Sequence, residues 1–417
     1  MPYWRHEFIV LDDKFPNAPS TVAGIFTKRP DPRAEKNITK YPPEFQISTI
    51  MTSLPSNLPE ASQAIPEYDP VYKTCLRVER ALSKLLAEKN HEQKTQLTTE
   101  LIYIRILGYL LHFIPSRTGL DSLARQIKEC SSDNDLLQLG QMYYDQYLRP
   151  FVFDNDGIVR FTSGRTSGSS RSSPMSRPSF DTLADMMTAY LTGEATPESF
   201  STVKKTALVR DGFRGVISGS YDSTALDANE QLRNQRLAQK PLPRRVFTEC
   251  VHIFPASINQ EIPLGSDENI QASMLWKVLQ GFGYTTLPDE LEGAKIHRLE
   301  NVMTLEANLH FFFDRLQLWF VATGEPNQYT IRNVYGSEFE CEGTVVTFKS
   351  SKPDLPPPSP VYLAIHAACA QVAHLSGAAK LMDQYEREME DGLVLCPSGD
   401  SAGLLDHALR GLKVAGY

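Results

Sequence analysis

A run of small and polar residues near the middle of the chain divides it into two parts. Residues 164–179, Gly-Arg-Thr-Ser-Gly-Ser-Ser-Arg-Ser-Ser-Pro-Met-Ser-Arg-Pro-Ser, have too few apolar side chains to build a core, and this composition is typical of a flexible linker. At 417 residues the chain is also long for one ordinary core. We therefore expect one unit over 1–157, a linker over 158–179, a second unit over 180–380, and an acidic helix with a tail over 381–417.

The first unit is predicted to be mainly helical. A short strand is expected at residues 7–11, and apolar segments at 101–113, 120–127 and 136–147 predict three helices. A fourth helix carries an apolar stripe with steps of three and four residues, made by Val71, Cys75, Val78, Leu82 and Leu85. Such stripes are buried against one another in a helical bundle. Since no catalytic pattern is present, we expect a structural module or one that binds a protein partner.

Composition excludes several classes of protein. The N-terminus lacks the apolar run of a secretory signal, and the longest apolar stretch, 102–114, is too short to span a bilayer. We therefore expect no contact with a membrane and an intracellular location, nuclear or cytoplasmic. The six cysteines form no CxxC pair, which argues against both a cysteine zinc site and a disulfide framework.

The charge pattern is compatible with a local binding site for nucleic acid but not with an all-round basic surface. The net charge of the chain is −8, which disfavours non-specific binding to a polyanion. Residues 201–250 nevertheless hold nine Lys and Arg against five Asp and Glu. Four arginines of this segment are candidates for phosphate contacts, with ordinary surface charge as the alternative: Arg210, Arg214, Arg244 and Arg245.

The second unit mixes helices with short strands, which predicts an α+β fold overall. Helices are expected at 180–191, 199–209, 268–279, 306–314 and 361–379. Strands are expected at 213–219, 245–255, 316–320, 329–332 and 345–348.

Chemically capable residues follow one another in a fixed order in this unit. His252 stands near the end of a predicted strand in Glu249-Cys-Val-His-Ile-Phe-Pro. Asn301 follows a loop, and His310 comes nine residues later on a predicted helix. Asp314 lies four residues beyond His310, so both side chains share one helix face. An imidazole and a carboxylate at this spacing suit Mg²⁺, Mn²⁺ or Zn²⁺.

This order, with its nine-residue step from Asn301 to His310, resembles fungal-type HNH nuclease domains over about residues 200–380. The resemblance implies a ββα unit, one divalent ion and hydrolysis of phosphodiester bonds in nucleic acid, for which we expect DNA. It also implies that His252 is the general base and Asn301 its orienting partner, with His310 and Asp314 as metal ligands. A histidine suits the first role because its pKa is close to the working pH.

The chain departs from the family pattern at three positions. Many HNH enzymes have a metal ligand directly before the base, where this chain has Val251, and Glu249 is the candidate substitute on the same strand face. Gly215 and Ser218 replace a cysteine and a threonine of relatives. Two alternatives therefore stay open: a catalytically degenerate scaffold that binds nucleic acid or protein, and a protein whose function rests on its N-terminal helices. Taken singly, His252 and His310 stand among apolar residues that are also typical of core histidines.

Overall fold

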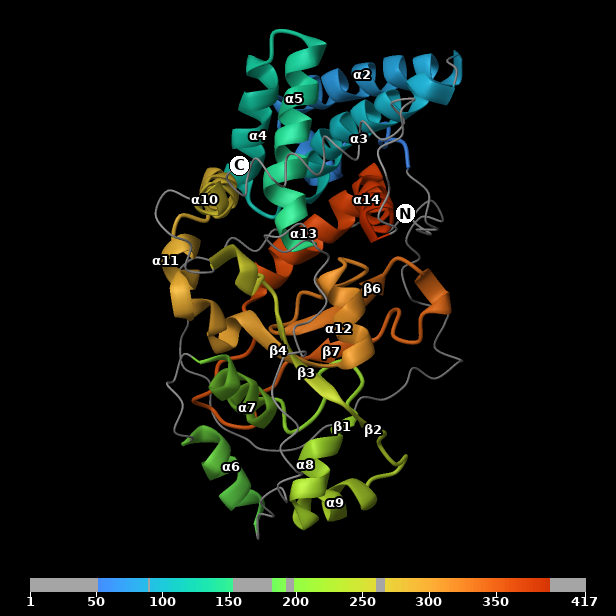
Figure 1. Cartoon of the computed structure of the whole chain (residues 1–417). Coiled ribbons are helices and arrows are strands. Elements are labelled where there is room, and N and C mark those ends of the chain that lie inside the picture. The colour runs from blue at the N-terminus through green and yellow to red at the C-terminus, as the bar shows by residue number, and fades with distance from the viewer. Residues whose placement is uncertain (1–51, 89–90, 153–181, 193–198, 260–266, 391–417) are drawn as a thin grey trace.

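The computed structural model describes residues 52–88, 91–152, 182–192, 199–259 and 267–390. The strand predicted at 7–11, the linker over 158–179 and the tail beyond 390 lie outside these residues. Figure 1 shows the N-terminal helices at one end, the strands in the middle and several short helices at the other end.

The N-terminal region is helical, as predicted. It contains α1 (Glu60–Gln63), α2 (Tyr68–Glu88), α3 (His91–Phe113), α4 (Arg117–Glu129), α5 (Asp133–Tyr143), η2 (Tyr144–Leu148) and η3 (Arg149–Phe151). The stripe expected on α2 is buried except at Leu85, which is 42% exposed. Ser116 and Ser132 begin α4 and α5 by accepting hydrogen bonds from backbone N–H groups of the first turn.

The remaining helices are distributed among short strands. They are α6 (Leu183–Leu191), α7 (Phe200–Arg210), α8 (Ser223–Ala228), α9 (Glu230–Leu237), η4 (Ala256–Asn259), α10 (Asp267–Gly281), α11 (Leu287–Leu291), η5 (Gly293–His297), η6 (Leu299–Asn301), α12 (Ala307–Asp314), η7 (Gly336–Glu338), α13 (Pro360–Ser376) and α14 (Ala378–Glu390). The helix predicted over 361–379 is interrupted at Gly377, whose φ of 91° is left-handed and ends α13.

In the part of the chain that the structure describes, the strands form three small sheets. They are β1 (Tyr221–Asp222), β2 (Arg245–Val246), β3 (Thr248–His252), β4 (Val302–Glu306), β5 (Leu318–Ala322), β6 (Gln328–Asn333) and β7 (Val345–Thr347). β1 and β2 are parallel, whereas β3–β4 and β5–β6–β7 are antiparallel. A mainly helical region followed by these sheets and helices confirms the α+β class.

Two local predictions differ from the structure. The segment 213–219 is a turn with one bridge, between Arg214 and Tyr221, instead of a strand. Gly219, with a φ of 65°, turns the chain back before a ladder can extend. Residues 302–305, for which no element is predicted, form β4 together with Glu306, which is predicted to begin the helix, because pairing with β3 buries all five residues.

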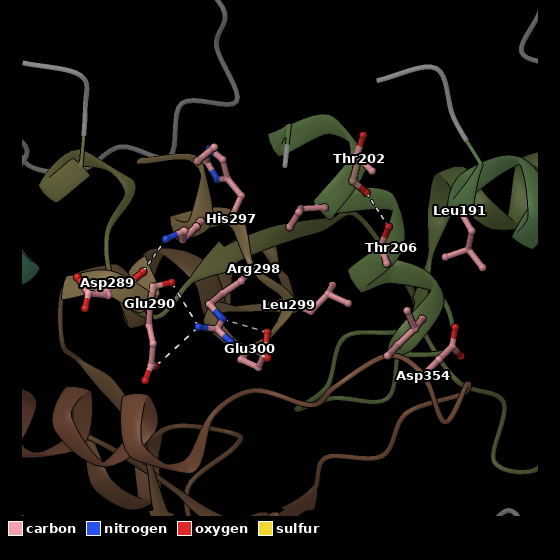
Figure 2. Close-up of a pocket in the computed structure, with 14 residues that line it drawn as sticks. Leu191, Thr202, Thr206, Asp289, Glu290, His297, Arg298, Leu299, Glu300 and Asp354 are labelled. Atoms are coloured by element: carbon pink, nitrogen blue, oxygen red, sulfur yellow. Dashed lines mark hydrogen bonds and ion pairs between the residues drawn. The ribbon is translucent and has the colours of Figure 1, made fainter. Parts of the chain in front are cut away.

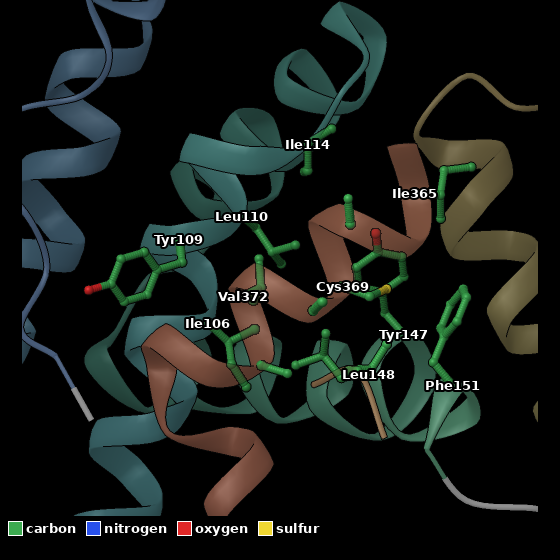
Figure 3. Close-up of a cluster of buried hydrophobic side chains, with 14 of the residues drawn as sticks. Ile106, Tyr109, Leu110, Ile114, Tyr147, Leu148, Phe151, Ile365, Cys369 and Val372 are labelled. Atoms are coloured by element: carbon green, nitrogen blue, oxygen red, sulfur yellow. The ribbon is translucent and has the colours of Figure 1, made fainter. Parts of the chain in front are cut away.

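One core connects the N-terminal helices with the end of the chain that follows the sheets. α13 packs against α3 on one side and β5 on the other. Figure 3 shows Ile106 and Leu110 of α3 beside Cys369 and Val372 of α13. The buried cluster that contains them extends in sequence from Leu54 to Tyr385. None of the helices in the described residues combines the length and apolar character needed to cross a membrane.

A buried ion pair inside the helical region supplies a stability test. Arg105 Nε donates to Glu79 Oε1 over 2.7 Å, and both side chains are about 95% buried. Glu79→Ala leaves the arginine buried without its partner, so we expect a loss of about 3–5 kcal/mol in the free energy of unfolding, measured with urea. The exposed pair of Arg77 and Asp133 is the control: Arg77→Ala should cost less than about 1 kcal/mol. Equal losses would contradict this assignment.

Candidate functional site

The β3–β4 hairpin and α12 form a ββα unit that carries most of the candidate residues. The strands pair in register from Thr248 opposite Glu306 to His252 opposite Val302. α12 starts directly after β4, at Ala307. Helix packing on β3 and β4 therefore places side chains of α12 above one face of the hairpin.

The two faces of β3 hold different candidate groups. Glu249 contacts α12 through His310, and Val251 packs in the same core cluster as residues of α12. Cys250 packs against residues of α7, and His252 stacks on Phe200 at the start of α7. This is the period-two alternation of a strand. Consequently, the structure gathers Glu249, His310 and Asp314 on one face and presents His252 on the other.

His310 lies between two carboxylates. Its Nδ1 is 2.6 Å from Glu249 Oε2, and its Nε2 is 3.1 Å from Asp314 Oδ2. His310 and Asp314 are one helical turn apart on α12, as the sequence spacing predicts, and both are buried. Glu249 is partly exposed and closes the group from the side of β3.

The electrostatics of this group favour the charged imidazole. Burial lowers the pKa of His310, but the hydrogen bonds with Asp314 and Glu249 outweigh burial and raise its pKa to about 9. The hydrogen bond with His310 in turn lowers the pKa of the Glu249 carboxyl. At neutral pH the three side chains therefore form an anion–cation–anion triad.

The donor types of the triad suit a divalent ion, but their arrangement is that of a closed hydrogen-bonded group. Both ring nitrogens of His310 are engaged by carboxylates, and a ligating imidazole must be neutral. Val251 lies fully buried where a further ligand is expected. Within the described residues, no set of three or more His, Cys, Asp or Glu side chains is arranged to hold a metal ion. An ion at this place has to displace the proton of His310.

His252 lies in a cluster of three rings on the opposite face. Its Nε2 is 2.9 Å from Nδ1 of His297, the last residue of η5. Phe200 stacks on His252 at a centroid distance of 5.4 Å and is 5.6 Å from the ring of His297. Burial lowers the pKa of His297, which favours its neutral form.

Asn301 is fully buried and fixes the backbone on both sides of this histidine pair. Its Oδ1 accepts from the backbone N–H of Phe254 over 2.8 Å, and its Nδ2 donates to the carbonyls of Phe254 and Ile296. Phe254 comes two residues after His252, and Ile296 directly precedes His297. Asn301 thus holds the main chain two residues after His252 and directly before His297, through an amide that does not titrate.

The four candidate arginines have different environments. Arg210 is 1% exposed, and partners in Asp211, Leu299, Val302 and Pro356 engage all five of its N–H donors. Arg214 lies over the Tyr221 ring at 3.9 Å. Arg244 and Arg245 are 57% and 41% exposed, and they pair with Glu306 and Asp227. Among the four, these last two offer the most solvent-facing charge.

A cavity of about 710 Å³ lies beside the histidine pair, between α7, α11 and η5. Figure 2 shows His297 at one side of it and Arg298 between Glu290 and Glu300. Four carboxylates and two cations line it, from Asp289, Glu290, Glu300, Asp354, Lys295 and Arg298. This excess of negative charge does not suit a polyanion.

A comparison with protein families matches this region. A family model described as HNH endonuclease matches residues 216–321, which contain the whole ββα unit. These residues form an HNH-type domain. The general activity of HNH endonuclease domains is cleavage of nucleic acid. No curated protein and no solved structure matches the chain significantly.

Sequence patterns did not single out two residues at the HNH-type domain's histidine pair, His297 and Phe200. His297 ends the short helix η5, 45 residues from His252, and no spacing rule relates the two positions. Phe200 belongs to α7, before the matched residues. The only sequence signal for His297 is its closeness to Asn301, four residues later.

The charged triad predicts that the free energy of unfolding falls as the pH rises above neutral. Because the pKa of His310 is raised above its unfolded value of 6.5, the stabilisation is complete below pH 6.5 and is lost as pH rises through about 9. Relative to His310→Gln, we expect wild type to lose on the order of 3 kcal/mol of unfolding free energy over this window. Urea unfolding from pH 6 to pH 10 in a chelating buffer measures it. A constant difference between the two proteins would refute the charged triad.

The buried hydrogen bonds of Asn301 predict that replacing it with an apolar side chain lowers the stability of the fold. Asn301→Ala leaves one backbone N–H and two carbonyl groups without this partner, and each such buried group costs about 1–3 kcal/mol. We therefore expect a loss of roughly 3 kcal/mol or more in urea unfolding. Asn234→Ala, at an exposed position of α9, is the control and should change little. A similar loss in both variants would be inconsistent with the bridging role.

Proposed function

We propose that this chain is a metal-dependent endonuclease of the HNH type that hydrolyses phosphodiester bonds, with DNA as substrate. The observation that carries the proposal is the ββα unit. In this unit β3 ends at His252, and Asn301 holds the backbone that follows through hydrogen bonds. The helix α12 carries His310 and Asp314. The family match over 216–321 supports the same reaction class. That the domain is of the fungal type is part of this proposal.

In the proposed reaction, His252 takes a proton from the attacking water. A general base must keep a fixed direction, and β3 together with the Asn301 bonds to Phe254 supplies a rigid backbone for His252. The partly exposed position of His252 at the end of the strand leaves room for solvent. An imidazole in its neutral form can accept the proton.

A divalent ion at this domain would be held by Glu249, His310 and Asp314, because carboxylates and imidazole are ligands for Mg²⁺, Mn²⁺ and Zn²⁺, and the closed hydrogen-bonded group would have to open for it. When bound, such an ion supplies positive charge to the phosphate and to the leaving oxygen. Glu249 takes the place of the ligand that Val251 cannot provide. The family generally uses one divalent ion, and His310 would have to give up a proton to hold it.

We assign phosphate contacts to Arg244 and Arg245, with Arg214 beside them. Arg244 and Arg245 are exposed and directly precede the ββα unit. Asp227, the half-exposed partner of Arg245, can be exchanged for a phosphate oxygen at the surface. Glu306, the partner of Arg244, is buried and stays with the fold. Arg210 is proposed as a scaffold residue, because its donors already have partners within the fold.

A second candidate function is a degenerate HNH scaffold that binds nucleic acid or protein without cleaving. Three observations favour it: Val251 is buried in the core, His310 is engaged on both nitrogens, and His252 faces the other side of β3. A binding surface requires none of the catalytic geometry. The N-terminal helices are the proposed place for a protein partner under either function.

Cleavage of supercoiled plasmid with Mg²⁺ or Mn²⁺ separates the two functions. We expect wild type to nick the plasmid, and His252→Ala to lower the rate by about 10²–10⁴-fold, the usual contribution of a general base. Asp314→Asn should weaken the response to metal. His112→Leu, in α3 of the helical region, is the control and should cleave like wild type.

The opposite outcome is equally informative. A folded wild-type protein that does not nick with either ion, yet retards the plasmid in a gel, would support the binding scaffold. Nicking that persists in His252→Ala would remove His252 from the proposed mechanism while leaving the reaction class in place.

A further inference from the structure

The ring pair of His252 and His297 is a feature that the family pattern does not assign. Nε2 of His252 and Nδ1 of His297 lie 2.9 Å apart, which is hydrogen-bond distance. One hydrogen bond between two imidazole nitrogens contains one proton, so one ring donates and the other accepts. The tautomer of His252 therefore depends on His297.

We propose that His297 is a positioning residue for His252: its Nδ1 accepts the Nε2–H of His252, so that Nδ1 of His252 is the nitrogen that takes the proton from water. This inference rests on the proposed function for its catalytic meaning. The proton moves from the attacking water to Nδ1 of His252, and the hydroxide that remains is the nucleophile. The resulting imidazolium keeps its Nε2–H bonded to His297.

Two further residues, Phe200 and Asn301, hold the pair in this arrangement. Phe200 covers both rings, at centroid distances of 5.4 and 5.6 Å. Asn301 bonds to the backbone of Phe254 and of Ile296 and thereby links the segments that carry the two histidines. Since the same amide ties both segments, a shift of one histidine requires a shift of the other.

The environment of His297 suits an acceptor. It is partly buried, and burial lowers its pKa, which favours a neutral ring at neutral pH. A charged His297 would place two like charges side by side when His252 becomes protonated. His297 also lines the cavity of Figure 2, so this side of the pair borders open space while Phe200 covers the other.

The test compares two substitutions at the same position. In His297→Asn the side-chain oxygen takes the place of Nδ1 and still accepts a hydrogen bond, whereas His297→Leu fills the space without an acceptor. Long-range ¹H–¹⁵N NMR spectra of the full chain report the tautomer of His252, assigned from its missing signals in His252→Gln. We expect the Nε2–H tautomer in wild type and His297→Asn, and a tautomer mixture in His297→Leu.

Plasmid nicking supplies the second measurement. Loss of a residue that orients a reactive group typically costs about 10–100-fold. We expect this loss in kcat for His297→Leu, with KM unchanged and with most of kcat restored in His297→Asn. An unchanged His252 tautomer in His297→Leu would overturn the inference. If the tautomer responds as expected but wild type does not nick, the positioning contact stands and the proposed endonuclease function fails.

Discussion

The pairing of β3 with β4 is the interaction on which the rest of the site depends. Five residue pairs in register, from Thr248–Glu306 to His252–Val302, hold two segments that are separated by about fifty residues in the sequence. A slip by one residue would exchange the two faces of the strand. It would move Glu249 away from His310 and turn His252 away from His297. The side chains of β4 are buried on both faces of the strand, so a slip would require the packing on both faces to change.

The same pairing places a charged group of side chains on one face of the β3–β4 hairpin and the pair of His252 and His297 on the other. On the α12 face, two carboxylates hold His310 in its charged form. On the α7 face, burial lowers the pKa of His297 and favours a neutral ring beside His252. Two histidines of one hairpin unit are therefore in opposite electrostatic environments. His310 acts as an electrostatic link between β3 and α12, whereas His252 pairs with the partly buried ring of His297.

The N-terminal helices and the sheet region share one core, which supports the candidate site. α13 contacts both α3 and β5, so the N-terminal helices are connected to the sheet region through packed side chains. Close-packed protein cores transmit strain between the elements that share them. The N-terminal helices thus contribute to the rigidity of the region that carries the HNH-type domain, in addition to any partner they bind.

The sequence by itself determined the α+β class, most helices and the strands of the β5–β6–β7 sheet, because local periodicity reports which side chains must be buried. The nine-residue step from Asn301 to His310, and the helical step to Asp314, likewise depend on short-range geometry. Tertiary structure alone decided three features. It made residues 302–306 a strand through pairing, buried Arg210 among backbone carbonyls, and brought His297 to His252 across 45 residues. Each of these depends on contacts between distant segments, which no pattern within a single segment can specify.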